Sequence, residues 1–259
     1  MNTIVAELPA TRLNVLRSYA LEARCEFLRV LRTPAFAIPS LLFPPLFYLL
    51  FGLLLNRGNT AAAHYLFATY GVFGAMGPAL FGFGVGVAIE RERGWLALKR
   101  VAPMPPGAYL LAKMIMAALF AIIIYAMLAT MAASVGGVRL AAAQWLLLGA
   151  VTVFGVLPFC ALGLLIGARA NAAAAPAIVN FIYLPMAFLS GLWVPLSMLP
   201  AFFTNIAGLW PPYHLAQLAL AAIGFEHSGS LVVHLLVLAA FTGLCWGFAR
   251  RALARAVAG

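Results

Sequence analysis

Long stretches without a charged residue are the feature that most limits how this chain can fold. Four such runs, all mainly apolar, separate Arg32 from Arg57, Arg57 from Glu90, Lys113 from Arg139, and Arg139 from Arg169. A helix needs about 20 consecutive apolar residues to cross a bilayer, and each run is long enough. Only 8% of the residues are charged, whereas a soluble domain carries about 25%. The sequence therefore predicts an all-α integral membrane protein.

Charges and prolines divide the chain into six predicted transmembrane helices. The first four are centred on residues 39–55, residues 65–89, and the two runs on either side of Arg139. No charge separates Arg169 from Glu226, but Pro195, Pro200, Pro211 and Pro212 interrupt that stretch. We expect a fifth span at residues 174–192 and a re-entrant external segment at residues 195–225, where protein or a cavity shelters non-helical backbone. The sixth span is expected at residues 231–249.

The positions of the basic residues predict the orientation. In this arrangement 14 Lys and Arg lie on the side that holds both termini, and only Arg57 and Arg139 lie on the other. Cytoplasmic loops are enriched in Lys and Arg, so both termini are predicted to be cytoplasmic. The net charge of +10 is spread in short clusters between spans and forms no single patch. We therefore expect membrane lipid, and no nucleic acid, as the partner of this charge.

Residues 1–33 are predicted to form a cytoplasmic helix along the membrane interface, ahead of a six-span domain at residues 34–259. Apolar residues at steps of three, four and seven share one helical face: Leu13, Leu16, Ala20, Phe27 and Leu31. Polar residues lie opposite, among them Glu22, Cys25, Glu26 and Arg29. Arg17 and Arg24 at the edge of the apolar face can extend to the lipid headgroups, which favours the interfacial helix over a solvated one.

The chain lacks the residues that bind ATP in a phosphate loop. It contains no Asp, and neither Lys99 nor Lys113 follows a Gly, which excludes the Gly-x-x-x-x-Gly-Lys-Ser/Thr pattern. All six Glu lie at or beyond the predicted span ends, so we expect none of the buried carboxylates typical of ion-coupled carriers. No catalytic, cofactor-binding or metal-binding residues are predicted, which disfavours a membrane-embedded enzyme.

The histidines allow two interpretations. His227 and His234 are seven residues apart, so on one helix they would share a face beside Glu226, as a metal or pH-sensitive site. The simpler interpretation, which we prefer, is that they are interfacial residues without a special role. His64 and His214 are isolated in the sequence.

Two motifs carry a resemblance to a known family. The loop after the second span reads Glu90-Arg91-Glu92-Arg93-Gly94-Trp95-Leu96-Ala97-Leu98-Lys99-Arg100-Val101-Ala102-Pro103 and leads to Lys113. The fifth span and its sequel contain Asn180, Pro185, Ser190-Gly191, Pro195, Leu199-Pro200, Trp210-Pro211 and Tyr213. In their order and spacing the sequence resembles the membrane subunits of ABC-2 type exporters over almost the whole chain. Ala97, where the family often has a polar residue, and the rigid Met104-Pro105-Pro106-Gly107 depart from the pattern.

The resemblance implies a cytoplasmic coupling loop at residues 90–113 that docks on a separate ATPase, which would bind the ATP. In a short amphipathic helix Trp95, Leu96 and Leu98 would be the buried anchors, surrounded by basic residues. Gly94 would turn the chain from the span into this helix. The coupling residues are then Glu90, Arg91, Glu92, Arg93, Gly94, Trp95, Leu96, Leu98 and Pro103. A basic loop that touches only lipid headgroups is the alternative.

By the same resemblance, spans two and five line a translocation path. The candidate path residues are Tyr70, Phe73, Phe83, Asn180 and Tyr183, with helix packing or lipid contact as the alternative for each. Small residues in span two (Gly71, Ala75, Pro78, Gly82, Gly86) and the pair Gly163 and Gly167 in span four are expected to let helices approach closely.

The resemblance also implies a complex. Two such chains, identical or paralogous, would combine with two ATPase subunits in the bacterial cytoplasmic (inner) membrane. They would export an amphiphilic or hydrophobic molecule such as a drug, a lipid or a lipid-linked glycan. A membrane scaffold or sensor subunit that moves no solute is the alternative from another class.

Overall fold

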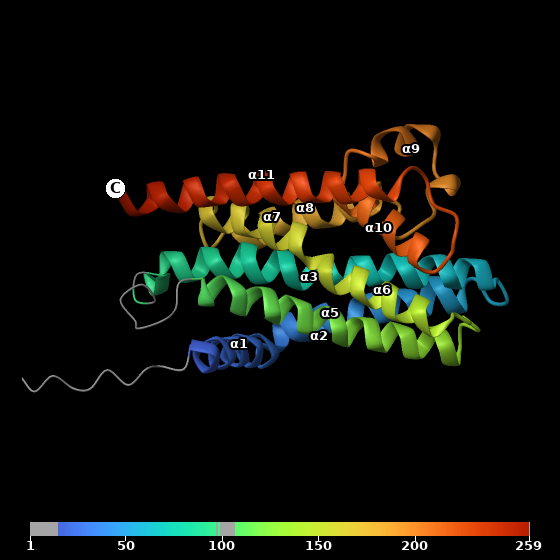
Figure 1. Ribbon diagram of the computed structural model, residues 1–259, viewed down its shortest axis with the longest axis horizontal. Coiled ribbons are helices and arrows are strands. Elements are labelled where there is room, and N and C mark those ends of the chain that lie inside the picture. Colours follow the sequence, from blue (N-terminus) through green and yellow to red (C-terminus); the bar gives the residue numbers. More distant parts are fainter. Residues whose placement is uncertain (1–14, 97, 99–106, 259) are drawn as a thin grey trace, which may run out of the picture.

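The structure, a computed structural model, describes residues 15–96, 98 and 107–258. In this part of the chain every regular element is a helix, as predicted, and the long helices lie side by side along one axis (Figure 1). In chain order the elements are α1 (Val15–Leu31), α2 (Pro34–Phe47), η1 (Tyr48–Leu54), α3 (Thr60–Glu92), α5 (Ala108–Ser134), α6 (Ala142–Phe154), α7 (Val156–Arg169), α8 (Ala175–Leu189), η2 (Leu196–Met198), α9 (Ala201–Ala207), α10 (Pro211–Ala222) and α11 (Leu231–Ala258).

Five helical stretches are long and apolar enough to cross a membrane. They are Pro34–Leu54, Thr60–Glu92, Ala108–Ser134, Ala142–Arg169 and Leu231–Ala254, and they match the predicted spans one to four and six. The helix at the fifth position, α8, has only 15 residues, or about 22 Å, which is shorter than the hydrocarbon core of about 30 Å. The predicted fifth helix is therefore present but shorter than expected.

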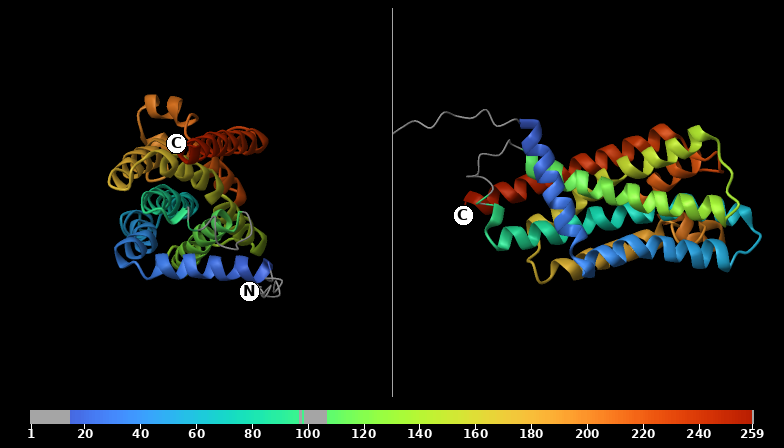
Figure 2. Two further views of the ribbon diagram at one scale, coloured as in Figure 1. Left: turned by 90° about the vertical axis from the view of Figure 1, so that its left-hand side faces the viewer. Right: turned by 90° about the horizontal axis from the view of Figure 1, so that it is seen from below.

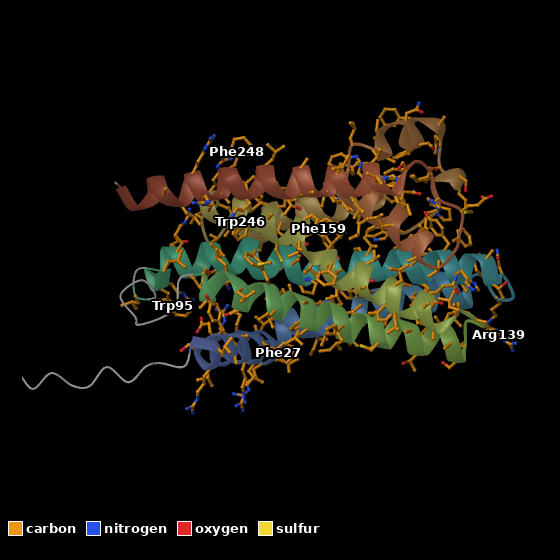
Figure 3. The ribbon with its side chains drawn as sticks, in the orientation of Figure 1. Phe27, Trp95, Arg139, Phe159, Trp246 and Phe248 are labelled. Atoms are coloured by element: carbon orange, nitrogen blue, oxygen red, sulfur yellow. The ribbon has the colours of Figure 1, made fainter. Side chains whose placement is uncertain are left out.

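The bundle has two distinct ends. At one end lie α1 and the C-terminal part of α11, and Figure 2 shows α1 lying across the bundle there. Trp95 also lies at this end (Figure 3). We call it the basic end because α1, the last turn of α7 and the C-terminal part of α11 carry arginines. At the opposite end lie Arg139, α9 and α10 (Figures 1 and 3).

Helix α3 is the central helix, and it packs against α2, α5, α6, α7, α8 and α10. Most of its residues from Leu66 to Glu90 are buried on all sides. Asn59 caps its start, since the side-chain oxygen accepts the backbone N–H of Ala62 at 3.1 Å. With 33 residues α3 is about 50 Å long, so it extends beyond a bilayer core and carries its last charged turn past the apolar region.

The predicted small-residue packing is confirmed between α3 and α7. A Cβ placed on Gly167 would lie 2.6 Å from the backbone oxygen of Phe83, and one on Gly163 would lie 3.0 Å from the oxygen of Leu80. The two helices approach too closely for any side chain at these positions. On another face of α3, Gly82 accommodates Met116 of α5, whose Cε would be 2.5 Å from an added Cβ.

Two helices are irregular for identifiable reasons. Pro39, Pro44 and Pro45 lie inside α2, where they remove backbone donors, and the π-helix η1 follows directly. The predicted fourth span is divided at Gly155, three residues before Pro158. An added Cβ on Gly155 would lie 2.5 Å from Leu215 Cδ2, so the break also makes room for α10.

Helix α1 turns part of its predicted polar face toward the bundle. Ala23 and Glu26 are buried, and Phe27 packs edge-on against Phe120 of α5 with ring centres 5.7 Å apart. Leu16 of the predicted apolar face is exposed, as are Ala20 and Leu31. The prediction that Glu26 lies on a solvated face is wrong because its carboxylate has charged partners inside the bundle.

Candidate functional site

Four charged side chains meet in a buried cluster where α1, α3 and α5 come together near the basic end. The ammonium of Lys113 on α5 donates to Glu26 Oε1 at 2.6 Å and to Glu90 Oε1 at 3.0 Å. Arg29 Nη2 lies 2.6 Å from Glu26 Oε1 and 2.7 Å from Glu90 Oε1. The Tyr109 hydroxyl donates to Glu90 Oε2. Two positive and two negative charges thus balance, and we call these four residues the charge cluster.

Three of the four charged residues, Glu26, Glu90 and Lys113, are buried, whereas the side chain of Arg29 is 40% exposed. Lys113 is 0% exposed and Glu90 is 1% exposed. Gly86 leaves space for the lysine, because a Cβ there would lie 3.2 Å from Lys113 Nζ. Burial alone raises the pKa of Glu26, but the charges of Lys113 and Arg29 outweigh it and hold that pKa below its ordinary value. Glu26 is therefore held in its ionised form, and the cluster links the interfacial helix to two long helices.

The sequence prediction of no buried carboxylate is wrong at Glu90. Its position at the end of a span is as predicted, but the side chain points into the protein. The signal that was available is Lys113, which lies in the second turn of an apolar helix, where a lone cation needs an acidic partner. Which acidic residue pairs with Lys113 depends on how α1 packs against the bundle. The spacing of apolar residues in the sequence does not show this.

The next two residues of α3 fasten the turn between α7 and α8. Arg91 Nη1 donates to the carbonyl of Ala168, and Arg91 Nη2 donates to that of Ala170 at 2.7 Å. Glu92 Oε2 accepts the backbone N–H of Ala172 at 2.7 Å. Glu90, Arg91 and Glu92 were predicted to face an ATPase, yet all three side chains bond to this chain.

The predicted coupling loop continues after Gly94. This glycine adopts a left-handed conformation with φ of +72° and turns the chain as expected. Trp95 is 38% exposed and Leu98 is 65% exposed, whereas Leu96 packs against the core. The Arg93 guanidinium lies 5.3 Å from the centre of the Trp95 ring. Ala97, Lys99, Arg100 and Pro103, also named for this loop, lie outside the described residues.

A second candidate site is a cavity of about 500 Å³ beside α3, between α2 and α8. Seven of its fifteen lining residues are aromatic, and Phe73 stacks on Tyr183 with ring centres 5.0 Å apart and planes at 10°. The lining residues are Ala35, Phe36, Pro39, Ser40, Phe43, Pro44, Phe47, Phe73, Gly74, Gly77, Phe81, Asn180, Tyr183, Leu184 and Trp193. We call this the aromatic cavity.

Three of the five predicted path residues line the aromatic cavity: Phe73, Asn180 and Tyr183. Tyr70 lies one layer behind it, with its ring 6.2 Å from that of Phe73. Phe83 is elsewhere, fully buried against α7 opposite Gly163. Its role in this structure is helix packing.

The structure contradicts the shared helical face proposed for His227 and His234 and the isolation of His214. His227 precedes the start of α11 at Leu231, so it shares no helical face with His234. His234 instead pairs with His214 of α10, at 2.8 Å between their Nδ1 atoms. His214 was considered isolated because 20 residues separate the two rings in sequence.

Helices of membrane length with apolar outer faces define a multi-pass membrane protein. The family model described as ABC-2 type transporter matches residues 20–224. The chain is also 32% identical over 209 residues to the protein named "Putative transport permease YvfS" of Bacillus subtilis (strain 168), a match that covers 79% of this chain and 84% of that protein. The chain belongs to the ABC-2 type transporter family, as the sequence motifs indicated. It is the membrane permease of an ABC transporter, a class that pairs with an ATPase subunit.

Proposed function

We propose that this chain is the membrane-spanning subunit of an ATP-driven exporter and that the aromatic cavity is part of the path for an amphiphilic or hydrophobic substrate. Two copies, or one copy and a paralogue, work with two separate ATPase subunits in the bacterial inner membrane. The chain crosses six times, with α8 and the residues after it as the fifth crossing. Both termini are cytoplasmic, so the basic end faces the cytoplasm.

The observation that carries this proposal is the aromatic cavity. Its rings offer a large apolar contact area, which suits a hydrophobic substrate. The amide of Asn180 is exposed and forms no hydrogen bond with any other described residue. An unpaired amide facing lipid tails is costly, which supports a wet or ligand-filled cavity rather than a lipid contact.

A second subunit is proposed to close the cavity. The outer faces of α2 and α8 flank it and are apolar, with Phe43 and Phe181 exposed on them. Six helices are too few to enclose a wide path, whereas two subunits facing each other across these helices would surround one. Asn180 of each subunit would then face a shared chamber and not the bilayer.

A direct test compares two residues of α8 with a control on α6. Asn180→Ala and Tyr183→Ala should change substrate-stimulated ATPase activity of the reconstituted complex by tenfold or more, because each removes a contact to the substrate, worth about 1.4 kcal/mol per factor of ten. Phe154→Ala on α6 is the matched control, since its exposed side chain neither lines the cavity nor lies on α2 or α8. Equal effects of all three substitutions would place the path elsewhere.

The topology has its own test. Single cysteines at residues 205 and 226 should react with an impermeant maleimide added outside, and cysteines at residues 2 and 259 only after permeabilisation. Reaction of residue 205 from the cytoplasmic side alone would contradict the external position of residues 195–225. Labelling of either terminus from outside would contradict the six crossings.

A further inference from the structure

Two buried histidines lie in contact at the end of the bundle opposite α1. His214 is 6% exposed and His234 is 4% exposed, and their Nδ1 atoms are 2.8 Å apart. The other nitrogen of each ring faces a backbone carbonyl. His214 Nε2 lies 2.9 Å from the oxygen of Gly208, and His234 Nε2 lies 2.6 Å from that of Ser228. The pair thus joins α10 to α11 and to the turns before each helix.

The hydrogen count of this arrangement is fixed by its acceptors. A carbonyl oxygen only accepts, so both Nε2 atoms must carry hydrogen. The short contact between the two Nδ1 atoms needs one further hydrogen, since two bare nitrogens would repel each other. Three hydrogens on four ring nitrogens give the pair one positive charge. Two neutral histidines carry only two hydrogens on these four nitrogens, so one of the three contacts would then lack its hydrogen.

No acidic group supplies this charge with a partner. Among the described residues no carboxylate forms an ion pair with either ring. Tyr213 places its ring edge-on to both imidazoles, at 5.4 Å and 6.0 Å. The α10–α11 loop carries Glu226 and His227, both exposed.

The helices packed around the pair add few titratable groups. Helix α3 brings Tyr65, whose hydroxyl donates to the Gly191 carbonyl, and His64 further out, while α6 brings none. The nearest such groups on α7 and α11 are Cys160 and Cys245, and their charged residues lie at the basic end. The proton is therefore held by the two rings and the two carbonyls.

We propose that His214 and His234 together bind one proton and form a pH-dependent clamp between α10 and α11. With one proton bound, all three contacts of the pair are hydrogen bonds. Loss of that proton leaves two acceptors facing each other at one contact. A second proton places N–H against N–H between two positive rings. The clamp is closed only in the pH range between these two steps.

Burial opposes a charge on this pair. It lowers the pKa of His214 and outweighs the bond to the Gly208 carbonyl, which favours the charged ring, and a charge on His234 lowers that pKa further. The two rings consequently titrate as one coupled unit with two separated steps. The claim that the clamp senses external pH rests on the proposed topology. The proton count does not depend on that topology.

The spectrum of the histidines tests the proton count directly. The full chain, labelled with ¹⁵N-histidine in nanodiscs of phosphatidylethanolamine and phosphatidylglycerol, contains only four imidazoles. Between roughly pH 5 and 8, the range in which histidine ordinarily titrates, we expect an Nε2–H signal from each of the two rings together with one Nδ1–H···Nδ1 coupling. A pair without the extra proton would show only two of these three hydrogens. Absence of the coupling at every pH, or titration of all four rings in one common step, would overturn the proposal.

Variants and a labelling assay test the clamp itself. In a Cys25→Ser background, a cysteine at Ser230 should react with an impermeant maleimide faster, relative to one at Asn56, once the pair loses its proton. His214→Gln and His234→Gln should abolish the coupling and make this ratio independent of pH, whereas His227→Gln should change neither. A ratio that never varies with pH in the unsubstituted pair would overturn the clamp. If a glutamine variant fails to fold, the wild-type spectrum and labelling ratio decide the matter.

Discussion

The ammonium nitrogen of Lys113 lies 2.6 Å from Oε1 of Glu26, although 87 residues separate them in the sequence. This contact joins the helix that lies across the bundle to a helix that runs along it. Glu90 forms an ion pair with the same lysine and so connects α3, the central helix, to these two helices. A displacement of α1 or of the end of α3 must therefore either move the other or separate buried charges, which is costly. In the proposed transporter this links the region near the ATPase to the helix beside the path.

The charge cluster should be sensitive to loss of one member and tolerant of matched losses. Lys113→Met leaves two buried carboxylates with only Arg29, and we expect a loss of about 3–5 kcal/mol in the free energy of unfolding. Adding Glu26→Gln to Lys113→Met should restore part of the lost stability, because Arg29 and Glu90 still pair. Thermal unfolding in detergent measures both, with exposed Arg24→Met on α1 as the control. A double variant less stable than the single one would contradict the argument.

Acidification should loosen α1. The pKa of Glu26 is lowered in the folded protein, so its contribution is complete above the ordinary value of 4.5 and is lost as the pH falls through the folded pKa. We expect protection of the α1 amides in hydrogen exchange, corrected for intrinsic rates, to decrease below pH 4.5. In Glu26→Gln this dependence should be weaker, and an unchanged profile would show that another group is responsible.

The contact between α3 and α7 predicts opposite effects for two glycines. In Gly167→Ala the new methyl group meets the backbone oxygen of Phe83 at 2.6 Å, so we expect a loss of about 1–3 kcal/mol or a failure to fold. Gly247→Ala on α11 meets nothing within 4 Å and should be neutral or gain up to about 1 kcal/mol in helix propensity. Expression level and thermal unfolding compare the two. Equal behaviour would mean that the helices can separate at Gly167 without cost.

Coupling to the ATPase should depend on Trp95 and Leu98. Both side chains are exposed in this chain, and an aromatic anchor buried by a partner commonly contributes about 2 kcal/mol. Trp95→Ala with Leu98→Ala should therefore weaken co-purification with the ATPase about thirtyfold, or uncouple ATP hydrolysis from export. Wild-type binding and transport at normal membrane levels would favour the loop that touches only lipid.

The two neighbouring arginines should behave differently from each other. Arg93→Ala is expected to weaken partner binding mildly and in a salt-dependent way, as exposed charges do. Arg91→Ala should instead lower thermal stability, because the carbonyls of Ala168 and Ala170 lose their donor. Matching salt dependence for both substitutions would show that Arg91 faces the partner after all.

Much of the architecture follows from the residue pattern alone. The five long spans, the presence of a helix after Ala174 and the packing of Gly163 and Gly167 were predictable, because apolar length and small-residue spacing act locally. Phe73, Asn180 and Tyr183, named as candidate path residues from the family resemblance of spans two and five, line the aromatic cavity. Phe83 was not separable from them, since a periodic pattern shows which residues share a face but not which helix covers it.

The sequence by itself determined which segments lie in lipid and which family the chain belongs to. Charge-free runs of sufficient length favour lipid whatever lies beside them, and the motifs keep their order along the chain. Only the tertiary structure decided the partners of the polar groups. Glu26 meets Lys113, and His214 meets His234, across long intervals of sequence. Such contacts depend on how whole helices are rotated and placed against one another, and the few buried polar atoms then take whichever partner that packing brings within hydrogen-bond distance.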